Sequence, residues 1–265
     1  MNRTNLQSKI RRLLLTGALL CCFAGPSVQP QLASGSCNEY RGTLGENIQI
    51  GMSLYAKAQT LQGSYFYKKH LTDIPLTGRY TAARDISLSE IDSANQPKGT
   101  FLLHFAESDS HFKTSTPLQA EVLQGKWVSA DGKFSYPVYL QTEHDCAIPG
   151  QTRYAVAGAT SDDLVEKNAR AFYDAVMAGN PTVAVKYVSF PATFFQSGKR
   201  ISIGNSAEFL KDYDQIFTAA FMARIAKGIP HHMFANAQGI MLADGAVWFD
   251  AEGKAKHFNN QLQAQ

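Results

Sequence analysis

The sequence lacks an excess of charge of either sign. It carries 25 Lys+Arg and 22 Asp+Glu over 265 residues. Four of the basic residues, Arg3, Lys9, Arg11 and Arg12, lie before an apolar run at 13–24, so the rest of the chain has 21 basic and 22 acidic residues. A nearly neutral chain has no basic field that would attract nucleic acid or an anionic membrane surface. We therefore expect no nucleic-acid partner.

Long hydrophobic runs are also lacking, apart from the run at 13–24. That run is too short to span a bilayer comfortably, and its place after the basic residues is typical of a signal peptide. We expect residues 1–24 to be a signal peptide and residues 25–36, rich in Pro, Ser, Gly and Gln, to be a flexible lead-in. The protein should then be periplasmic or secreted, without a membrane span.

Cysteine is scarce, with four residues in the chain. Cys21 and Cys22 fall in the expected signal peptide, which leaves Cys37 and Cys146. An even pair in an exported protein predicts a disulfide, and this one would close a loop of about 110 residues. The alternative is a pair of buried thiols.

Motifs for common chemistry are missing as well. The chain has no Gly-x-Ser-x-Gly motif and no phosphate-binding glycine loop. The residues Glu143-His144-Asp145-Cys146 are all consecutive, and no second cluster has the spacing of metal ligands. We therefore expect neither a metal site nor a cofactor.

A repeated pattern fills the first half of the chain: a glycine followed, two residues later, by an aromatic residue. The four pairs are Gly63 and Tyr65, Gly78 and Tyr80, Gly99 and Phe101, and Gly125 and Trp127. They accompany seven or eight short runs of alternating polarity within 37–150, separated by turn residues. This predicts an antiparallel β-meander, barrel-like and closed or nearly closed. The glycines should mark strand starts, with the aromatic rings on one side of the sheet.

The pattern changes at Ser161, which is a good helix N-cap before two acidic residues. An apolar stripe of helical spacing follows, and Asn205 with Glu208 resembles a capping box at the start of a later helix. Short alternating runs then fill 232–259. We expect residues 161–262 to form an α+β cone, with helices packed on a curved antiparallel sheet. The chain therefore has two expected domains, 37–150 and 161–262.

The segment 165–260 resembles the nuclear-transport-factor-like superfamily, also called ketosteroid-isomerase-like or cystatin-like, in a version found in exported bacterial proteins of unassigned role. The likeness is carried by Ser189-Phe190-Pro191, Gly198-Lys199, the run from Glu208 to Phe217, and the run from Gly239 to Phe249. The first half resembles small exported β-meander and barrel domains. The superfamily resemblance implies a pocket between the sheet and the helices.

The candidate catalytic residues are His231, His232 and Asp212. Asp212 and Asp214 lie about 200° apart on a helix, so they cannot both face one pocket. Adjacent residues of a strand point to opposite faces, so His231 and His232 are not expected to chelate one metal. One of the two histidines could still point inward as a general base.

The candidate binding residues are Tyr65, Phe66, Tyr67, Tyr213 and Trp248, with core packing as the alternative for the last two. Three consecutive aromatics place rings on both faces of a strand, so at least one lies outside the barrel core or against the second domain. We expect a non-enzymatic periplasmic protein that binds a small apolar ligand or a partner protein, such as an envelope enzyme or toxin. The alternatives are an enzyme of isomerase or hydrolase type that uses the cone pocket, and a structural envelope accessory.

Overall fold

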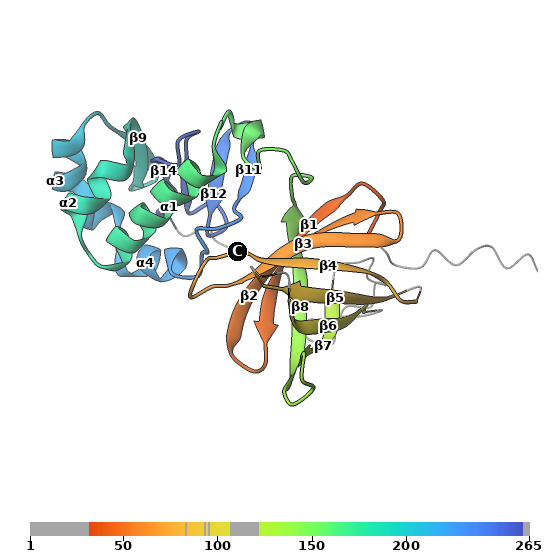
Figure 1. Cartoon of the computed structure of the whole chain (residues 1–265). Coiled ribbons are helices and arrows are strands. Elements are labelled where there is room, and N and C mark those ends of the chain that lie inside the picture. Colours follow the sequence, from red (N-terminus) through yellow and green to blue (C-terminus); the bar gives the residue numbers. More distant parts are fainter. Residues whose placement is uncertain (1–31, 83, 93, 95, 107–121, 262–265) are drawn as a thin grey trace, which may run out of the picture.

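The computed structural model describes residues 32–82, 84–92, 94, 96–106 and 122–261. A closed antiparallel barrel comes first, and a mixed sheet with helices, here called the αβ unit, follows it (Figure 1). The expected signal peptide and most of the lead-in lie outside the described residues. No helix in the described part of the chain is long and apolar enough to cross a membrane.

Eight strands form the barrel in sequence order, each antiparallel to the next, and β1 pairs with β8 to close it. The predicted closed meander is thereby confirmed. The strands are β1 (Cys37–Leu44), β2 (Ile48–Lys57), β3 (Thr60–Tyr67), β4 (Ile74–Tyr80), β5 (Asp85–Ile91), β6 (Pro97–Phe105), β7 (Val122–Ser129) and β8 (Ser135–Asp145).

The aromatic residue of each repeat faces the barrel interior. Tyr65 and Phe101 are fully buried with ring centroids 5.0 Å apart, and Tyr80 and Trp127 pack against the same core. The prediction that these rings share one side of the sheet is confirmed. Side chains therefore fill the barrel, and the repeat contributes to its core.

The glycines of the repeat lie within strands, so the prediction that they mark strand starts is wrong. The reason is steric. A Cβ atom added to Gly63 would collide with the carbonyl oxygen of Ser53 on the neighbouring strand, and one added to Gly125 would collide with that of Leu102. Glycine therefore permits a close approach of backbones inside a tightly coiled sheet.

We predict that Gly63→Ala destabilises the barrel by about 1–3 kcal/mol or more, because the added methyl group overlaps a backbone atom that cannot rotate away. Urea unfolding followed by fluorescence measures the change. The control is Gly204→Ala, where the nearest atom to a new Cβ is the Glu208 carboxylate at 3.4 Å. Equal stability of the two variants would contradict this account of the repeat.

A disulfide joins Cys37, the first residue of β1, to Cys146, just beyond the end of β8. The predicted pairing is confirmed. The two cysteines are 109 residues apart in sequence, so the bond ties together the ends of the entire barrel. Its stabilising effect comes mainly from restricting the unfolded chain.

We predict that the double variant Cys37→Ser, Cys146→Ser loses up to about 4–5 kcal/mol of unfolding free energy, as expected for a loop of this length. Urea unfolding of both proteins, with and without a thiol-free reductant, measures the loss. The reductant should destabilise the natural protein and leave the double variant unchanged. A double variant as stable as the oxidised protein would contradict the prediction.

The αβ unit starts with α1 (Asp162–Met177), capped by the Ser161 side chain, which accepts from Leu164 N at 3.2 Å. The predicted caps at Ser161 and Asn205 are both present. The further helices are α2 (Pro181–Ala184), α3 (Ser206–Ile216) and α4 (Ala219–Ile225). The strands are β9 (Val188–Gln196), β10 (Lys199–Ile203), β11 (Phe234–Asn236), β12 (Gly239–Leu242), β13 (Val247–Phe249) and β14 (Ala255–Phe258).

The sheet of the αβ unit has the order β10-β9-β14-β13-β12-β11. The prediction of an all-antiparallel sheet is wrong in one place, because β14 runs parallel to β9. The chain leaves β9, forms β10 and two helices, and returns through the hairpins of β11–β13 to place its last strand beside β9. Such a long connection allows a parallel pair, whereas a tight hairpin does not.

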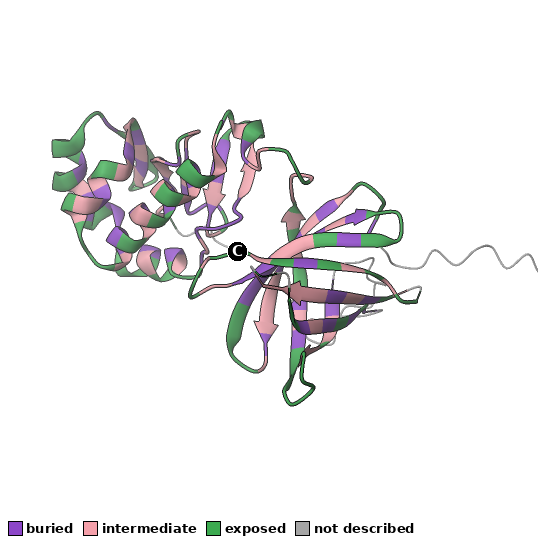
Figure 2. Ribbon diagram, in the orientation of Figure 1, coloured by how far each residue is buried: buried purple, intermediate pink, exposed green. Residues whose placement is uncertain are grey.

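Aromatic side chains occupy the core of the αβ unit, in the place where the superfamily resemblance implies a pocket. Phe172, Phe209, Phe217, Phe249 and Phe258 are all buried and contact one another. Figure 2 shows buried residues running through the interiors of both units. Polar and charged side chains that are covered by neighbours lie instead at the junction between the two units.

Candidate functional site

Glu39 is the most unusual residue at the junction, a carboxylate with no exposed surface on the outside of the barrel. Glu39 and Arg41 alternate on β1 with Tyr40, which lies in the barrel core, so both point outward to the αβ unit. Ser53 donates to Glu39 at 2.6 Å, and the Arg153 guanidinium pairs with the same carboxylate oxygen. Burial alone would raise the pKa of Glu39, but the hydrogen bond with His232 and the charges of Arg153 and Arg41 hold it far below its usual range.

Every nitrogen of the Arg41 guanidinium group has a partner, and Nη2 connects the barrel to the αβ unit. Nη2 donates to the carbonyl oxygens of His231 and His232 at 3.1 and 2.9 Å. Nε pairs with Glu143 at 2.9 Å, and Nη1 lies 3.4 Å from Glu39. Because each of these nitrogens already has a partner, Arg41 fixes the junction and is not available to an incoming anion.

His231 and His232 lie between α4 and β11, and their rings point to the same side. The expectation that they face opposite directions is wrong, because β11 begins only at Phe234 and His232 has a left-handed backbone with φ of 49°. Their rings stack with centroids 4.2 Å apart and planes 21° apart. Both histidines are buried, with exposed fractions of 8% and 3%.

Both histidines contact one carboxylate from the barrel, Asp73. His231 Nε2 is 3.2 Å from Asp73 Oδ1, and His232 Nε2 is 2.9 Å from Asp73 Oδ2. The ligand atoms of these three residues, here called the His–Asp cluster, lie within 4.8 Å of one another. Imidazole and carboxylate together are a typical ligand set for a transition-metal ion.

A second set of groups holds the other nitrogen of each ring. Glu166 on α1 bonds His231 Nδ1, and Ser53 Oγ lies 3.0 Å from His232 Nδ1. Glu166 also accepts from His232 N at 3.0 Å and from the buried Tyr154 hydroxyl at 2.8 Å. The contacts of Glu166 and Ser53 with the Nδ1 atoms therefore fix the orientation of both rings.

His231, Asp73 and Glu166 stabilise the charged forms of one another through their hydrogen bonds. Burial would lower the pKa of His231, but hydrogen bonds with Asp73 and Glu166 outweigh it and raise this pKa to about 9. Burial would raise the pKa of Asp73, but hydrogen bonds with both histidines hold it well below its usual range. The pKa of Glu166 is lowered in the same way, with hydrogen bonding to His231 outweighing burial.

The three consecutive aromatics divide between the two faces of β3, as predicted. Phe66 is fully buried outside the barrel core, edge-on to His231 and His232 at 4.5 and 5.2 Å between ring centroids. Tyr65 is fully buried in the barrel interior, and Tyr67 packs beside it with the two hydroxyl oxygens 3.3 Å apart. Tyr65 and Phe66 therefore serve the core and the junction and offer no exposed binding surface.

The remaining candidates lie away from the histidines, in other elements of the αβ unit. Asp212 is half-buried and Asp214 exposed on α3, and Tyr213 between them packs in the core, 4.6 Å from Phe217 between ring centroids. Trp248 on β13 is half-buried and pairs in register with Met241 and His257. The structure does not bring Asp212 together with the histidines as an acid–base group.

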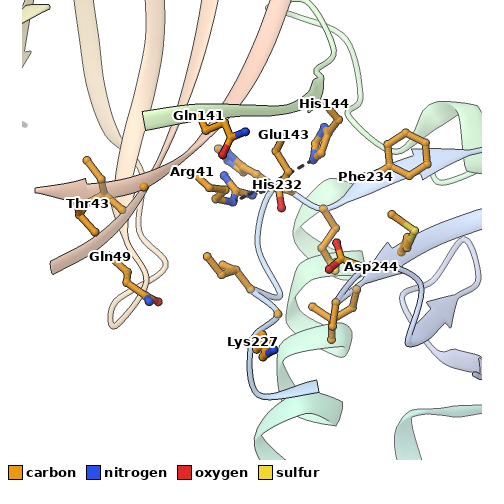
Figure 3. A pocket seen from close by; sticks show the side chains of 18 of the residues that line it. Arg41, Thr43, Gln49, Gln141, Glu143, His144, Lys227, His232, Phe234 and Asp244 are labelled. Atoms are coloured by element: carbon orange, nitrogen blue, oxygen red, sulfur yellow. Dashed lines mark hydrogen bonds and ion pairs between the residues drawn. The ribbon is translucent and has the colours of Figure 1, made fainter. Parts of the chain in front are cut away.

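A cleft of about 650 Å³ opens beside His232, between the barrel and the αβ unit. One wall comes from β1, β2 and β8, including Thr43, Gln49 and Gln141, as the close-up in Figure 3 shows. The other wall comes from β11, β12 and the segment at 227–234, including Phe234 and Met241. Volumes of this size are typical of small-molecule sites.

Sequence reasoning identified the two histidines but missed the residues that complete the site. Glu39, Asp73, Arg153 and Glu166 come from β1, the β3–β4 loop, the connection before α1, and α1 itself. Their separation in the sequence leaves no spacing motif to detect. A weak signal is available for Glu39, since a charged residue within a closing strand of a barrel needs a partner if it is covered.

No protein-family model matches the chain, and no curated protein sequence matches it.

We predict that Arg41→Met lowers the free energy of unfolding by about 3–5 kcal/mol, because Glu39 stays buried after losing a charged partner. Trp127 in the barrel and Trp248 in the αβ unit report the unfolding of each unit in urea by fluorescence. The control is Arg79→Met on an exposed position of β4, with an expected change within about 0.5 kcal/mol. Equal losses in the two variants would show that Arg41 does not hold the junction.

Proposed function

We propose that the protein is an exported binding protein of the bacterial envelope that holds a small, largely apolar ligand in the cleft between the barrel and the αβ unit. The observation that carries this proposal is the cleft itself, of about 650 Å³ with walls from both units. The disulfide supports an oxidising compartment outside the cytoplasm. The Glu39 and Arg41 contacts support a preformed site, because they fix the two walls relative to each other.

The chemistry of the walls favours a ligand without a net charge. Phe234 and Met241 are half-buried and give one wall an apolar surface, while Gln49 and Gln141 are exposed on the barrel wall and offer amide groups. Arg41 is already bonded to Glu143 and to two carbonyl oxygens. Lys227 and Asp244 line the cleft with one charge of each sign. A neutral ligand with an apolar body and a few polar groups suits this arrangement.

The alternative of an isomerase or hydrolase receives less support from the same site. That alternative places a catalytic base in a pocket inside the αβ unit, but aromatic rings are packed there. His231 and His232 are buried at the junction, and every ring nitrogen already contacts a carboxylate or a hydroxyl group. Ring nitrogens that already contact these groups are not placed to take a proton from a substrate in the cleft.

The partner-protein hypothesis also receives less support, because it calls for exposed aromatic residues at 65–67 or at the domain junction. Tyr65 and Phe66 are fully buried. The cleft is concave, and concave sites of this volume suit small molecules better than the flat surfaces of most protein interfaces.

The test uses N-phenyl-1-naphthylamine, a neutral apolar probe whose fluorescence rises in an apolar site. We expect saturable binding of one probe per chain to the purified protein. Met241→Glu should weaken it at least ~10-fold, a loss of about 1.4 kcal/mol, because a carboxylate would then lie on the apolar wall. Native mass spectrometry of protein purified without denaturation would show any ligand that remains bound.

The matched control is Leu210→Glu, which also places a carboxylate on a partly exposed apolar position of the αβ unit. Leu210 lies on α3, on the side of the unit away from the barrel in Figure 1. The affinity of the Leu210→Glu variant for the probe should equal that of the natural protein. Loss of affinity in both variants, or no saturable binding at all, would contradict the proposal.

A further inference from the structure

The hydrogen bonds at the Nδ1 atoms of the two histidines determine which ring nitrogen carries a proton. Ser53 has one hydroxyl proton, and it donates that proton to the ionised Glu39 at 2.6 Å. Ser53 must therefore accept from His232 Nδ1, 3.0 Å away. Glu166 is a carboxylate that only accepts when ionised, so His231 Nδ1 donates to it. Both rings carry a proton on Nδ1.

A neutral imidazole with its proton on Nδ1 presents a lone pair at Nε2. Each Nε2 atom here faces an oxygen of Asp73, at 3.2 Å for His231 and 2.9 Å for His232. A lone pair that faces a carboxylate oxygen is repelled, so each contact needs a positive centre. A single cation among the three side chains would supply that positive centre for both rings.

The two rings lie close together and largely away from water. The ring centroids are only 4.2 Å apart, and both side chains are buried with at most 10% of their surface exposed. One divalent cation would contact both rings and the Asp73 carboxylate at a single point.

We propose that the His–Asp cluster is a binding site for a divalent transition-metal ion of the zinc class. The ligands are His231 Nε2, His232 Nε2 and a carboxylate oxygen of Asp73. The three ligand atoms lie within 4.8 Å of one another, so an ion with bonds of about 2.0–2.2 Å would contact all three after small movements of these side chains. Three protein ligands leave a fourth position for water or another small ligand.

Imidazole ligands favour zinc and its neighbours over magnesium or calcium, which prefer oxygen ligands. The surrounding groups match those of metal-bound histidines, whose second nitrogen commonly donates to a carboxylate or another acceptor. Glu166 has this role for His231, and Ser53, itself bonded to Glu39, has it for His232. The site therefore contains both the ligands and the groups that orient them.

An ion can reach the cluster from the surface. Asp73 lies between β3 and β4, and its side chain is 43% exposed, whereas the histidines lie behind it. The site adjoins the proposed ligand cleft, since His232 lines that cleft whereas Asp73 and His231 do not. The zinc titration uses no apolar probe, so its result is read separately from the test of the cleft.

The experiment uses the full-length protein without an affinity tag, stripped with a chelator and desalted. Titration with zinc chloride by calorimetry should give one ion per chain. Glu166 only orients a ligand, so Glu166→Gln should weaken zinc affinity by ~10–100-fold. Asp73→Asn removes a ligand itself and should weaken zinc affinity by more than that. Cobalt(II) in place of zinc should give the visible absorption of a low-coordinate imidazole site, which Asp73→Asn abolishes.

The control is His257→Asn, since His257 is a partly exposed histidine of the αβ unit that bonds Thr193 at 2.9 Å and lies outside the cluster. It should bind zinc as the natural protein does. Circular dichroism checks that Asp73→Asn is folded, as expected for a substitution of the same size at an exposed position. Zinc binding that is absent in the natural protein, or unchanged in both Asp73→Asn and Glu166→Gln, would overturn the proposal.

Discussion

The arrangement of the two units depends on one buried carboxylate. Glu39 has no exposed surface, and a charge removed from water in this way is costly unless other groups replace the lost hydration. The replacements come from Ser53 and Arg41 in the barrel, Arg153 in the connecting segment and His232 in the αβ unit. Because one carboxylate is shared by three parts of the chain, separating the units would leave it without several of its partners.

This constraint explains why candidate sites occur at the junction and not inside either unit. The barrel is filled by Tyr65, Phe101 and their neighbours, and the αβ unit by a cluster of phenylalanines. Among the described residues, both cores are packed with apolar side chains. The junction instead combines charged groups, two stacked imidazoles and an adjoining cleft, and Arg41 holds its geometry through the carbonyl oxygens of both histidines.

The sequence was most informative for features that depend on neighbouring residues. Alternating polarity predicted the barrel strands, and Ser161 and Asn205 predicted two helix caps. The disulfide links distant residues, but it was predictable because only two cysteines remained to pair. It failed where distant parts of the chain meet. The parallel pairing of β14 with β9 depends on a long connection, and no local pattern links Asp73 or Glu166 to the histidines.

The adjacent histidines show how one backbone angle can reverse a conclusion from sequence. Alternation along a strand puts neighbouring side chains on opposite faces, and that rule excluded a shared metal ion. His232 has φ of 49°, outside the extended region, and both rings therefore turn toward Asp73. A left-handed residue other than glycine or asparagine is costly and persists only when its surroundings hold it. Here the main chain of His232 is fixed on both sides, by Glu166 at its N–H group and by Arg41 at its carbonyl oxygen. The strain is thus maintained by the same contacts that join the two units.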